Sequence, residues 1–178
     1  RALAADAEIR ERFLAEARAA RKIAHPSVCR IFDHYDADEG PFYSMDYLPG
    51  PTLAEVLNAG RVESREAQRM ALEIAEALQA AHRKEILHCD LKPGNVILAG
   101  TGRGRRAVLT DFGLARALHG GAGTAGGTKD YMAPELLDGQ EPTVRSDIYA
   151  YGQLLRRLRP RHRAGDWCAA ASPNDRPA

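Results

Sequence analysis

Apolar residues recur at helical spacing in three stretches of the chain. The first covers residues 5–24, where His25-Pro26 should end the helix because a residue before proline is driven out of the α region. Residues 64–83 and 145–158 show the same period among charged positions. The expected apolar face of the second helix comprises Ala67, Met70, Ala71, Ile74, Leu78 and Ala81. The pattern therefore predicts three amphipathic helices.

Shorter runs rich in β-branched and aromatic residues predict strands. Residues 28–34 and 41–47 flank a polar turn at 36–40 and so favour a hairpin. Residues 96–98 and 107–110 are two further short apolar runs in the middle of the chain. Together with the helices, they predict an α+β fold in which helices dominate the second half.

Several segments between these elements carry turn or cap signals. Pro49-Gly50-Pro51 breaks the chain, and Thr52 can cap a short helix that runs through Leu57. The glycine-rich residues 120–127 predict a loop, and residues 167–171 favour one more short helix.

Composition narrows the class of protein. The 178 residues are 44% hydrophobic and 28% charged, as in globular domains. A net charge of +1 gives no bulk attraction to nucleic acid or to an anionic membrane, and no apolar run is long enough to cross a bilayer. Three widely spaced cysteines without a CxxC pair argue against a disulfide framework or a zinc site. They favour a reducing compartment, and we expect a cytoplasmic protein.

The segment Leu87–Leu98, LHCDLKPGNVIL, concentrates polar chemistry between apolar flanks. His88 and Asp90 stand close to Lys92 and Asn95, so that an acid, a cation and an amide share one short loop. The apolar run 96–98 predicts a buried strand that would anchor this loop.

The order of motifs resembles that of eukaryotic-type Ser/Thr protein kinases. His-x-Asp-x-x-x-x-Asn at 88–95 is followed by Asp-Phe-Gly at 111–113 and by Tyr-Met-Ala-Pro-Glu at 131–135. The segment 147–152 and Asp-Arg-Pro at 175–177 complete the series over nearly the whole chain.

The resemblance implies a bilobal fold. Residues 1–48 would form a partial N-lobe that lacks its first strands, and residues 49–178 a shortened, mostly helical C-lobe. The first residue is Arg1 rather than Met, so we expect a piece of a longer chain that carries further domains.

The resemblance also implies phosphoryl transfer from ATP to Ser/Thr hydroxyls of a protein, with Mg2+. Asp90 would accept the hydroxyl proton, and Lys92 would stabilise charge on the transferred group. Asn95 and Asp111 are hard oxygen ligands that would hold magnesium and, through it, the nucleotide. Lys92 and Thr128 match Ser/Thr rather than tyrosine kinases, and Thr128 would bridge Asp90 and Lys92.

Further positions are implied to contact the nucleotide. Met45 would line the rear of the pocket, the backbone of Asp46 and Leu48 would meet adenine, and Ile97 would pack beneath it. Glu16 stands where the family keeps a glutamate that pairs with the phosphate-binding lysine.

A second set of positions is implied to be structural. Ala20, Ile31, His88 and Phe112 fall where the family stacks a hydrophobic column. Asp147 would hold the base of that column through backbone N–H groups, and Glu135 would pair with Arg176.

The chain departs from the family in three places. No glycine-rich loop or Val-Ala-x-Lys precedes Glu16, so this chain alone should bind nucleotide poorly and be weakly active or inactive. Cys89 replaces an arginine that often receives an activation-loop phosphate, which predicts activity independent of Thr124 phosphorylation through that contact. The stretch 153–174 is short, and its arginines form either a patch for an acidic partner or a solvated helix end.

Two other functions fit parts of the pattern. A pseudokinase that only binds partners agrees with the missing lysine and glycine loop but not with the complete set at 90, 92, 95 and 111. A small-molecule phosphotransferase shares His-x-Asp-x-x-x-x-Asn, but Lys92 and the segment 131–135 are foreign to that group.

Overall fold

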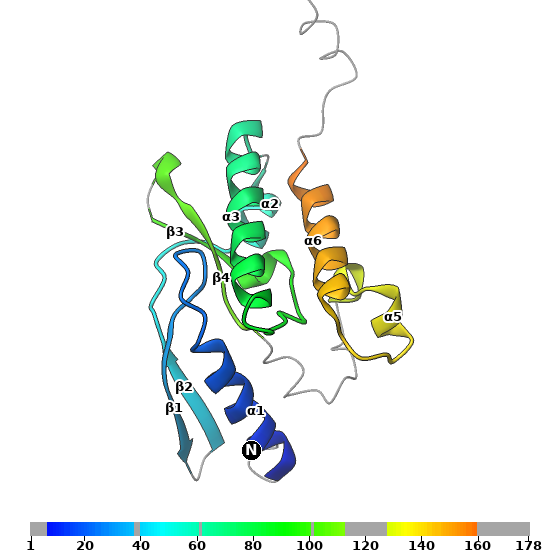
Figure 1. The fold of residues 1–178 in the computed structure, drawn as a ribbon. Helices are drawn as coiled ribbons and strands as arrows, with labels where there is room; N and C mark the ends of the chain where they lie inside the picture. The colour runs from blue at the N-terminus through cyan, green and yellow to red at the C-terminus, as the bar shows by residue number, and fades with distance from the viewer. Residues whose placement is uncertain (1–6, 38–39, 61, 101, 113–127, 160–178) are drawn as a thin grey trace, which may run out of the picture.

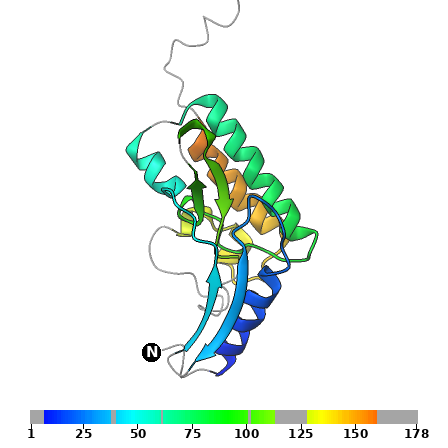
Figure 2. The ribbon, with the colours of Figure 1, turned by 90° about the vertical axis from the view of Figure 1, so that its left-hand side faces the viewer.

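The computed structural model describes residues 7–37, 40–60, 62–100, 102–112 and 128–159. Helix α1 (Ala7–Ala20) and a hairpin of β1 (Ile31–Ala37) and β2 (Gly40–Met45) form one end of the molecule (Figure 1). The other elements form the opposite end (Figures 1 and 2). The α+β composition predicted from the sequence is confirmed.

Helix α1 packs along one face of the hairpin, because this packing buries the apolar stripe of the helix. Phe13, Leu14, Ala17 and Ala20 are all buried. Polar contacts fasten the exposed edge of the helix, since Arg18 Nε donates to His34 Nε2 at 2.8 Å and Arg21 Nη1 to Asp33 Oδ1 at 3.1 Å. Helix and hairpin therefore form one packed unit.

The ends of these elements differ from the predictions. The helix stops at Ala20, because Lys22 and Ile23 donate to carbonyls three residues back and tighten the last turn. The first strand begins at residue 31 instead of 28, because the Cys29 N–H donates to the Leu109 carbonyl at 2.8 Å. The backbone at 28–29 therefore bridges to a distant strand, and β1 forms further along than predicted. β2 instead runs from residue 40 to residue 45, so it begins and ends slightly before the predicted range 41–47.

The Pro49–Pro51 segment passes against β3 (Val96–Ala99). A Cβ atom on Gly50 would lie 2.1 Å from the Leu98 carbonyl oxygen, so only glycine fits this approach. The next residue, Pro51, accepts from the Leu98 N–H at 2.9 Å. Thr52 then caps α2 (Leu53–Ala59) through reciprocal hydrogen bonds with Glu55, which confirms the predicted cap. The helix ends at Ala59, two residues after the predicted end at Leu57.

The largest layer consists of helices beside a small sheet. Helices α3 (Ser64–His82) and α6 (Val144–Leu158) confirm the helices predicted at 64–83 and 145–158, and they lie side by side (Figure 1). β3 pairs antiparallel with β4 (Arg106–Leu109), and β4 lies against α3 (Figure 2). A short helix, α5 (Pro134–Leu137), was not predicted and precedes α6.

Short 3-10 turns complete the described chain: η2 (Pro93–Asn95), η3 (Gly102–Gly104) and η4 (Thr128–Tyr131). The predicted loop at 120–127 and helix at 167–171 lie outside the described residues. Within the described part, no helix has both the length and the apolar character needed to span a bilayer.

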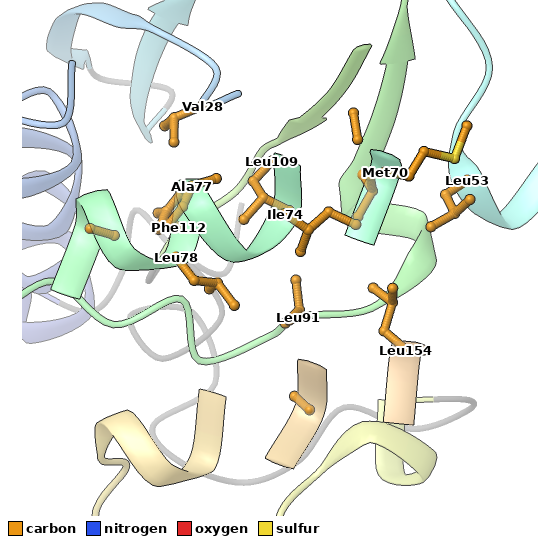
Figure 3. Close-up of a cluster of buried hydrophobic side chains, with 14 of the residues drawn as sticks. Val28, Leu53, Met70, Ile74, Ala77, Leu78, Leu91, Leu109, Phe112 and Leu154 are labelled. Carbon is orange, nitrogen blue, oxygen red and sulfur yellow. The ribbon is translucent and has the colours of Figure 1, made fainter. Parts of the chain in front are cut away.

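The core lies where α3, α6 and the β3–β4 pair meet (Figure 3). Met70 and Ile74 of α3, Leu109 of β4 and Leu154 of α6 belong to this cluster, and all four are fully buried. The predicted apolar face of α3 is confirmed except that Ala71 is half-buried and Ala77 takes a fully buried place.

Ile74→Ala should lower the free energy of unfolding by about 2–5 kcal/mol, because the side chain is fully buried and its loss leaves a cavity. Leu72→Ala is the matched control on the same helix, because Leu72 is 61% exposed. We expect the control to change stability by less than about 0.5 kcal/mol in urea denaturation. Equal losses in the two variants would contradict the placement of the core.

Candidate active site

The polar loop 88–95 runs between α3 and β3 and is anchored by apolar residues, as predicted. Leu91 within it is 1% exposed, and Val96 and Leu98 just after it are fully buried. Figure 3 shows Leu91 pointing toward the side chains of the core. The loop therefore has little freedom to move relative to the helices.

The Asp147 carboxylate on α6 holds the beginning of this loop. Its two oxygens accept the backbone N–H groups of His88 at 2.8 Å and Cys89 at 2.9 Å. His82 Nε2 also lies 2.7 Å from Asp147 Oδ2. These bonds confirm the predicted role of Asp147, and they fix a turn in which Cys89 has a positive φ of 64°.

Burial and hydrogen bonding act oppositely on Asp147. Burial alone would raise its pKa, but the bonds from His82, His88 and Cys89 favour the ionised form, and the net pKa lies below its usual range. Burial lowers the pKa of His88, because its imidazole is fully enclosed. His88 is therefore a neutral ring, and it packs on Phe112 with the ring centroids 4.6 Å apart.

All four residues of the predicted hydrophobic column are buried: Ala20, Ile31, His88 and Phe112. Glu135, predicted to pair with Arg176, accepts a hydrogen bond from Ser146 Oγ at 2.9 Å. Arg176 lies outside the described residues.

Asp90 is the centre of a short hydrogen-bonded cluster. Lys92 Nζ lies 2.6 Å from Asp90 Oδ2. Asn95 Nδ2 donates to the same oxygen at 3.0 Å and to the Asp90 carbonyl at 2.8 Å. The Asp90 side chain is 12% exposed, so its carboxylate is oriented by neighbours while one edge still reaches solvent.

Asn95 and Asp111 are brought together by the pairing of β3 with β4. The register joins Val96 to Leu109, and the Asn95 carbonyl accepts the Thr110 N–H at 3.0 Å. The two side chains thus leave from adjacent strand ends. Because the Asn95 amide nitrogen makes both bonds to Asp90, its oxygen is directed away from that residue.

The chemistry of these two donors fits magnesium, which prefers hard oxygen ligands and usually takes few from the protein. Asp111 is exposed and has a positive φ of 60°. Among the described residues, no group of three or more His, Cys, Asp or Glu side chains is placed to hold a metal. A metal at Asn95 and Asp111 would therefore draw its other ligands from phosphate and water.

Of the residues predicted to contact the nucleotide base, Met45, Asp46 and Leu48 lie at or just after the end of β2, and Ile97 lies in β3. Met45 is 43% exposed, whereas Leu48 and Ile97 are half-buried. The Asp46 N–H donates to the Arg30 carbonyl at 3.0 Å, and the Asp46 carbonyl lies 3.7 Å from Cys29 Sγ. Burial raises the pKa of the Cys29 thiol to about 11, so it stays protonated.

Two predicted site residues are only partly placed. Glu16 lies half-buried on α1, one turn after Phe13. Thr128 opens η4, and its side chain lies outside what the structure describes.

Two residues that sequence reasoning missed touch the site. Tyr43 Oη donates to Asp111 Oδ1 at 3.1 Å, and burial together with the Asp111 charge raises the pKa of Tyr43. His82 contacts Asp147. Neither residue belongs to a motif, and no local spacing in the sequence signals either contact.

Comparison with known families matches residues 2–163 to the protein kinase domain. The chain is 37% identical over 163 residues to serine/threonine-protein kinase pkn2 of Myxococcus xanthus, covering 88% of this chain and 20% of that protein. It is also 37% identical over 161 residues to serine/threonine-protein kinase PkaA of Streptomyces coelicolor, covering 88% of this chain and 30% of that protein. The chain thus spans less than a third of either relative.

Among solved structures, the crystal structure of the Mycobacterium tuberculosis PknI kinase domain matches with a TM-score of 0.71. The sequence identity is 29%, and the match covers 88% of this chain and 59% of that chain. The predicted fold, with a partial first lobe, agrees with this likeness.

Asp147→Asn should lower the free energy of unfolding by about 1–3 kcal/mol at pH 7, because an amide nitrogen would face a buried N–H donor. Asp138→Asn is the control, because Asp138 is exposed at the end of α5. We expect the control to remain within about 0.5 kcal/mol of the original chain.

The difference in the free energy of unfolding between the original chain and Asp147→Asn should depend on pH. A carboxylate whose folded-state pKa is lowered stabilises the fold above its ordinary pKa of about 4 and loses that contribution as the pH falls through its folded value. The gap between the original chain and Asp147→Asn should therefore narrow in acid. A gap that widens toward pH 3 would contradict this role.

Proposed function

The chain belongs to the protein kinase family, and we propose that it is the catalytic part of a serine/threonine kinase. The reaction is transfer of the ATP γ-phosphoryl group to a Ser or Thr hydroxyl of a protein substrate. The observation that carries the proposal is the oriented Asp90 carboxylate, held by Lys92 and Asn95 beside the strand ends that present Asn95 and Asp111.

Asp90 accepts the proton of the attacking hydroxyl. A general base must be held within hydrogen-bonding reach of that proton, and the bonds from Lys92 and Asn95 fix one carboxylate oxygen while the other can face a substrate. Lys92 places its positive charge beside the same carboxylate, where charge on the transferred group needs stabilisation.

Asn95 and Asp111 would hold Mg2+ through their side-chain oxygens. When bound, the metal would supply positive charge that offsets the negative charge of the phosphate groups. The protein would position these groups. The β3–β4 pairing sets the spacing of the two proposed ligands, and the hydrogen bonds from Asn95 to Asp90 fix the place of Asn95 relative to the proposed base. Phosphoryl transfer asks mainly for this kind of positioning.

The nucleotide base is assigned to the end of β2 and to β3. In this assignment Met45 lines the rear of the site, the backbone of Asp46 and Leu48 meets adenine, and Ile97 packs beneath the ring. The Asp46–Arg30 bond and the Thr52–Ile97 bridge support it, because they fix both sides of this region.

Residues 1–48 and 49–178 are proposed as the two lobes. The tight passage at Gly50 and the packing of α1 on its own hairpin support a boundary there. Glu16 on α1 is proposed to form an ion pair with the phosphate-binding lysine of the complete first lobe.

The proposed acceptor is a Ser or Thr hydroxyl, because Lys92 and Thr128 match Ser/Thr kinases and not tyrosine kinases. The names of the relatives, which are serine/threonine-protein kinases, support this assignment. Thr128 is assigned to bridge Asp90 and Lys92. The partners are ATP and a protein substrate, with further domains in the parent protein and a cytoplasmic location. The much greater length of the relatives supports the further domains.

Asp90→Asn in the full-length protein should reduce turnover by about 100- to 10,000-fold, because the base is lost while the amide keeps the shape of the side chain. Nucleotide affinity should stay close to that of the original protein, because the proposed nucleotide contacts are elsewhere. Turnover is measured as phosphate incorporation from labelled ATP into a generic Ser/Thr protein substrate.

Asp138→Asn is the matched control, because Asp138 is exposed at the end of α5 and belongs to no proposed site. Its turnover should equal that of the original protein. Undiminished turnover in Asp90→Asn would remove Asp90 from its role, and phosphorylation of small alcohols but not of protein would assign a different acceptor.

A further inference from the structure

We infer that Tyr43 is a positioning residue of the proposed metal site. Its hydroxyl fixes the orientation of the Asp111 carboxylate and links that orientation to the position of α1. The inference rests on the proposed function, because it concerns how Asp111 binds Mg2+. It adds a residue that belongs to none of the sequence motifs.

The Asp111 carboxylate has a hydrogen-bond donor on each oxygen. Tyr43 Oη donates to Oδ1 at 3.1 Å, and Thr110 Oγ1 donates to Oδ2 at 3.3 Å. Because Asp111 is exposed, its side chain would otherwise sample several rotamers in water. Two donors on opposite oxygens select one orientation, and a carboxylate with about four lone-pair sites still has sites left for a metal.

Tyr43 is itself held rigidly enough to serve as a reference point. It lies in β2 opposite His34, and its half-buried ring packs on the ring of Phe13 with the centroids 5.8 Å apart. Phe13 is 7% exposed and belongs to α1. The hydroxyl is therefore placed by the packing of the helix on the hairpin.

This contact joins the two halves of the site. Asn95 and Asp90 belong to the loop that Asp147 fastens to α6, whereas Tyr43 belongs to the unit of α1 and its hairpin. Asp111 receives its backbone position from β4 and its side-chain orientation partly from Tyr43. A shift of α1 against the rest of the molecule would therefore turn one metal ligand relative to the other.

Tyr43→Phe in the full-length protein tests the inference, since it removes only the hydroxyl and keeps the ring that packs on Phe13. ADP binding is measured by calorimetry without metal and across a Mg2+ titration. We expect the Mg2+ concentration at half-effect to rise about three- to tenfold, as for the loss of one hydrogen bond of typical net strength. Metal-free ADP affinity should not change.

Tyr35→Phe is the matched control. Tyr35 lies on the neighbouring strand, is 46% exposed and stacks on Phe42, away from Asp111. The control should follow the original Mg2+ titration, and thermal unfolding of both variants should stay within a few degrees of the original protein, since each variant loses only one hydroxyl group.

A double-variant cycle separates orientation of Asp111 from a general loosening of the fold. In the Asp111→Asn background, Tyr43→Phe should cause no further loss of Mg2+ dependence. An equal loss in both backgrounds, or an unchanged or tighter Mg2+ response in Tyr43→Phe alone, would overturn the inference. Absence of any Mg2+-dependent ADP binding in the original protein would instead overturn the proposed function.

Discussion

The Asp147 carboxylate is the constraint from which the geometry of the site follows. It takes the N–H groups of His88 and Cys89 out of the solvent and pairs both with one charged group inside the protein. Hydrogen bonds to a buried charge are stronger than neutral ones, so they can maintain the positive φ of Cys89. Once that turn is fixed, Asp90 emerges in one direction, and Lys92 and Asn95 can close around it.

The site then depends on a second, independent constraint, which is the pairing of β3 with β4. One strand begins directly after Asn95 and the other ends two residues before Asp111. Their antiparallel register brings an amide and a carboxylate from distant parts of the sequence to adjacent strand ends. Asp90, the proposed base, and Asn95 and Asp111, the proposed metal ligands, therefore share a scaffold of α6, the loop 88–95 and a small sheet. Helix α1 and its hairpin contact this group through Tyr43.

The long helices and the capped start of α2 were predictable, because periodicity and capping are local signals. The first strand of the hairpin begins later than predicted because residues 28–29 bridge to Leu109, and no local pattern reports a partner so far along the chain. The same reason explains the missed contacts: Tyr43 meets Asp111 across 68 positions and His82 meets Asp147 across 65. Motif spacing predicted Asp90, Lys92, Asn95 and Asp111 as site residues from their chemistry. It gave no signal for Tyr43, which contacts Asp111, or for His82, which contacts Asp147.

A crystal structure of the full-length protein with Mg2+ and a non-hydrolysable ATP analogue would test the proposed site most directly. We expect a metal ion bound by the side-chain oxygens of Asn95 and Asp111, with the Asp147 carboxylate still accepting the N–H groups of His88 and Cys89. A metal bound elsewhere, or Asn95 and Asp111 turned away from the phosphates, would contradict the proposed site.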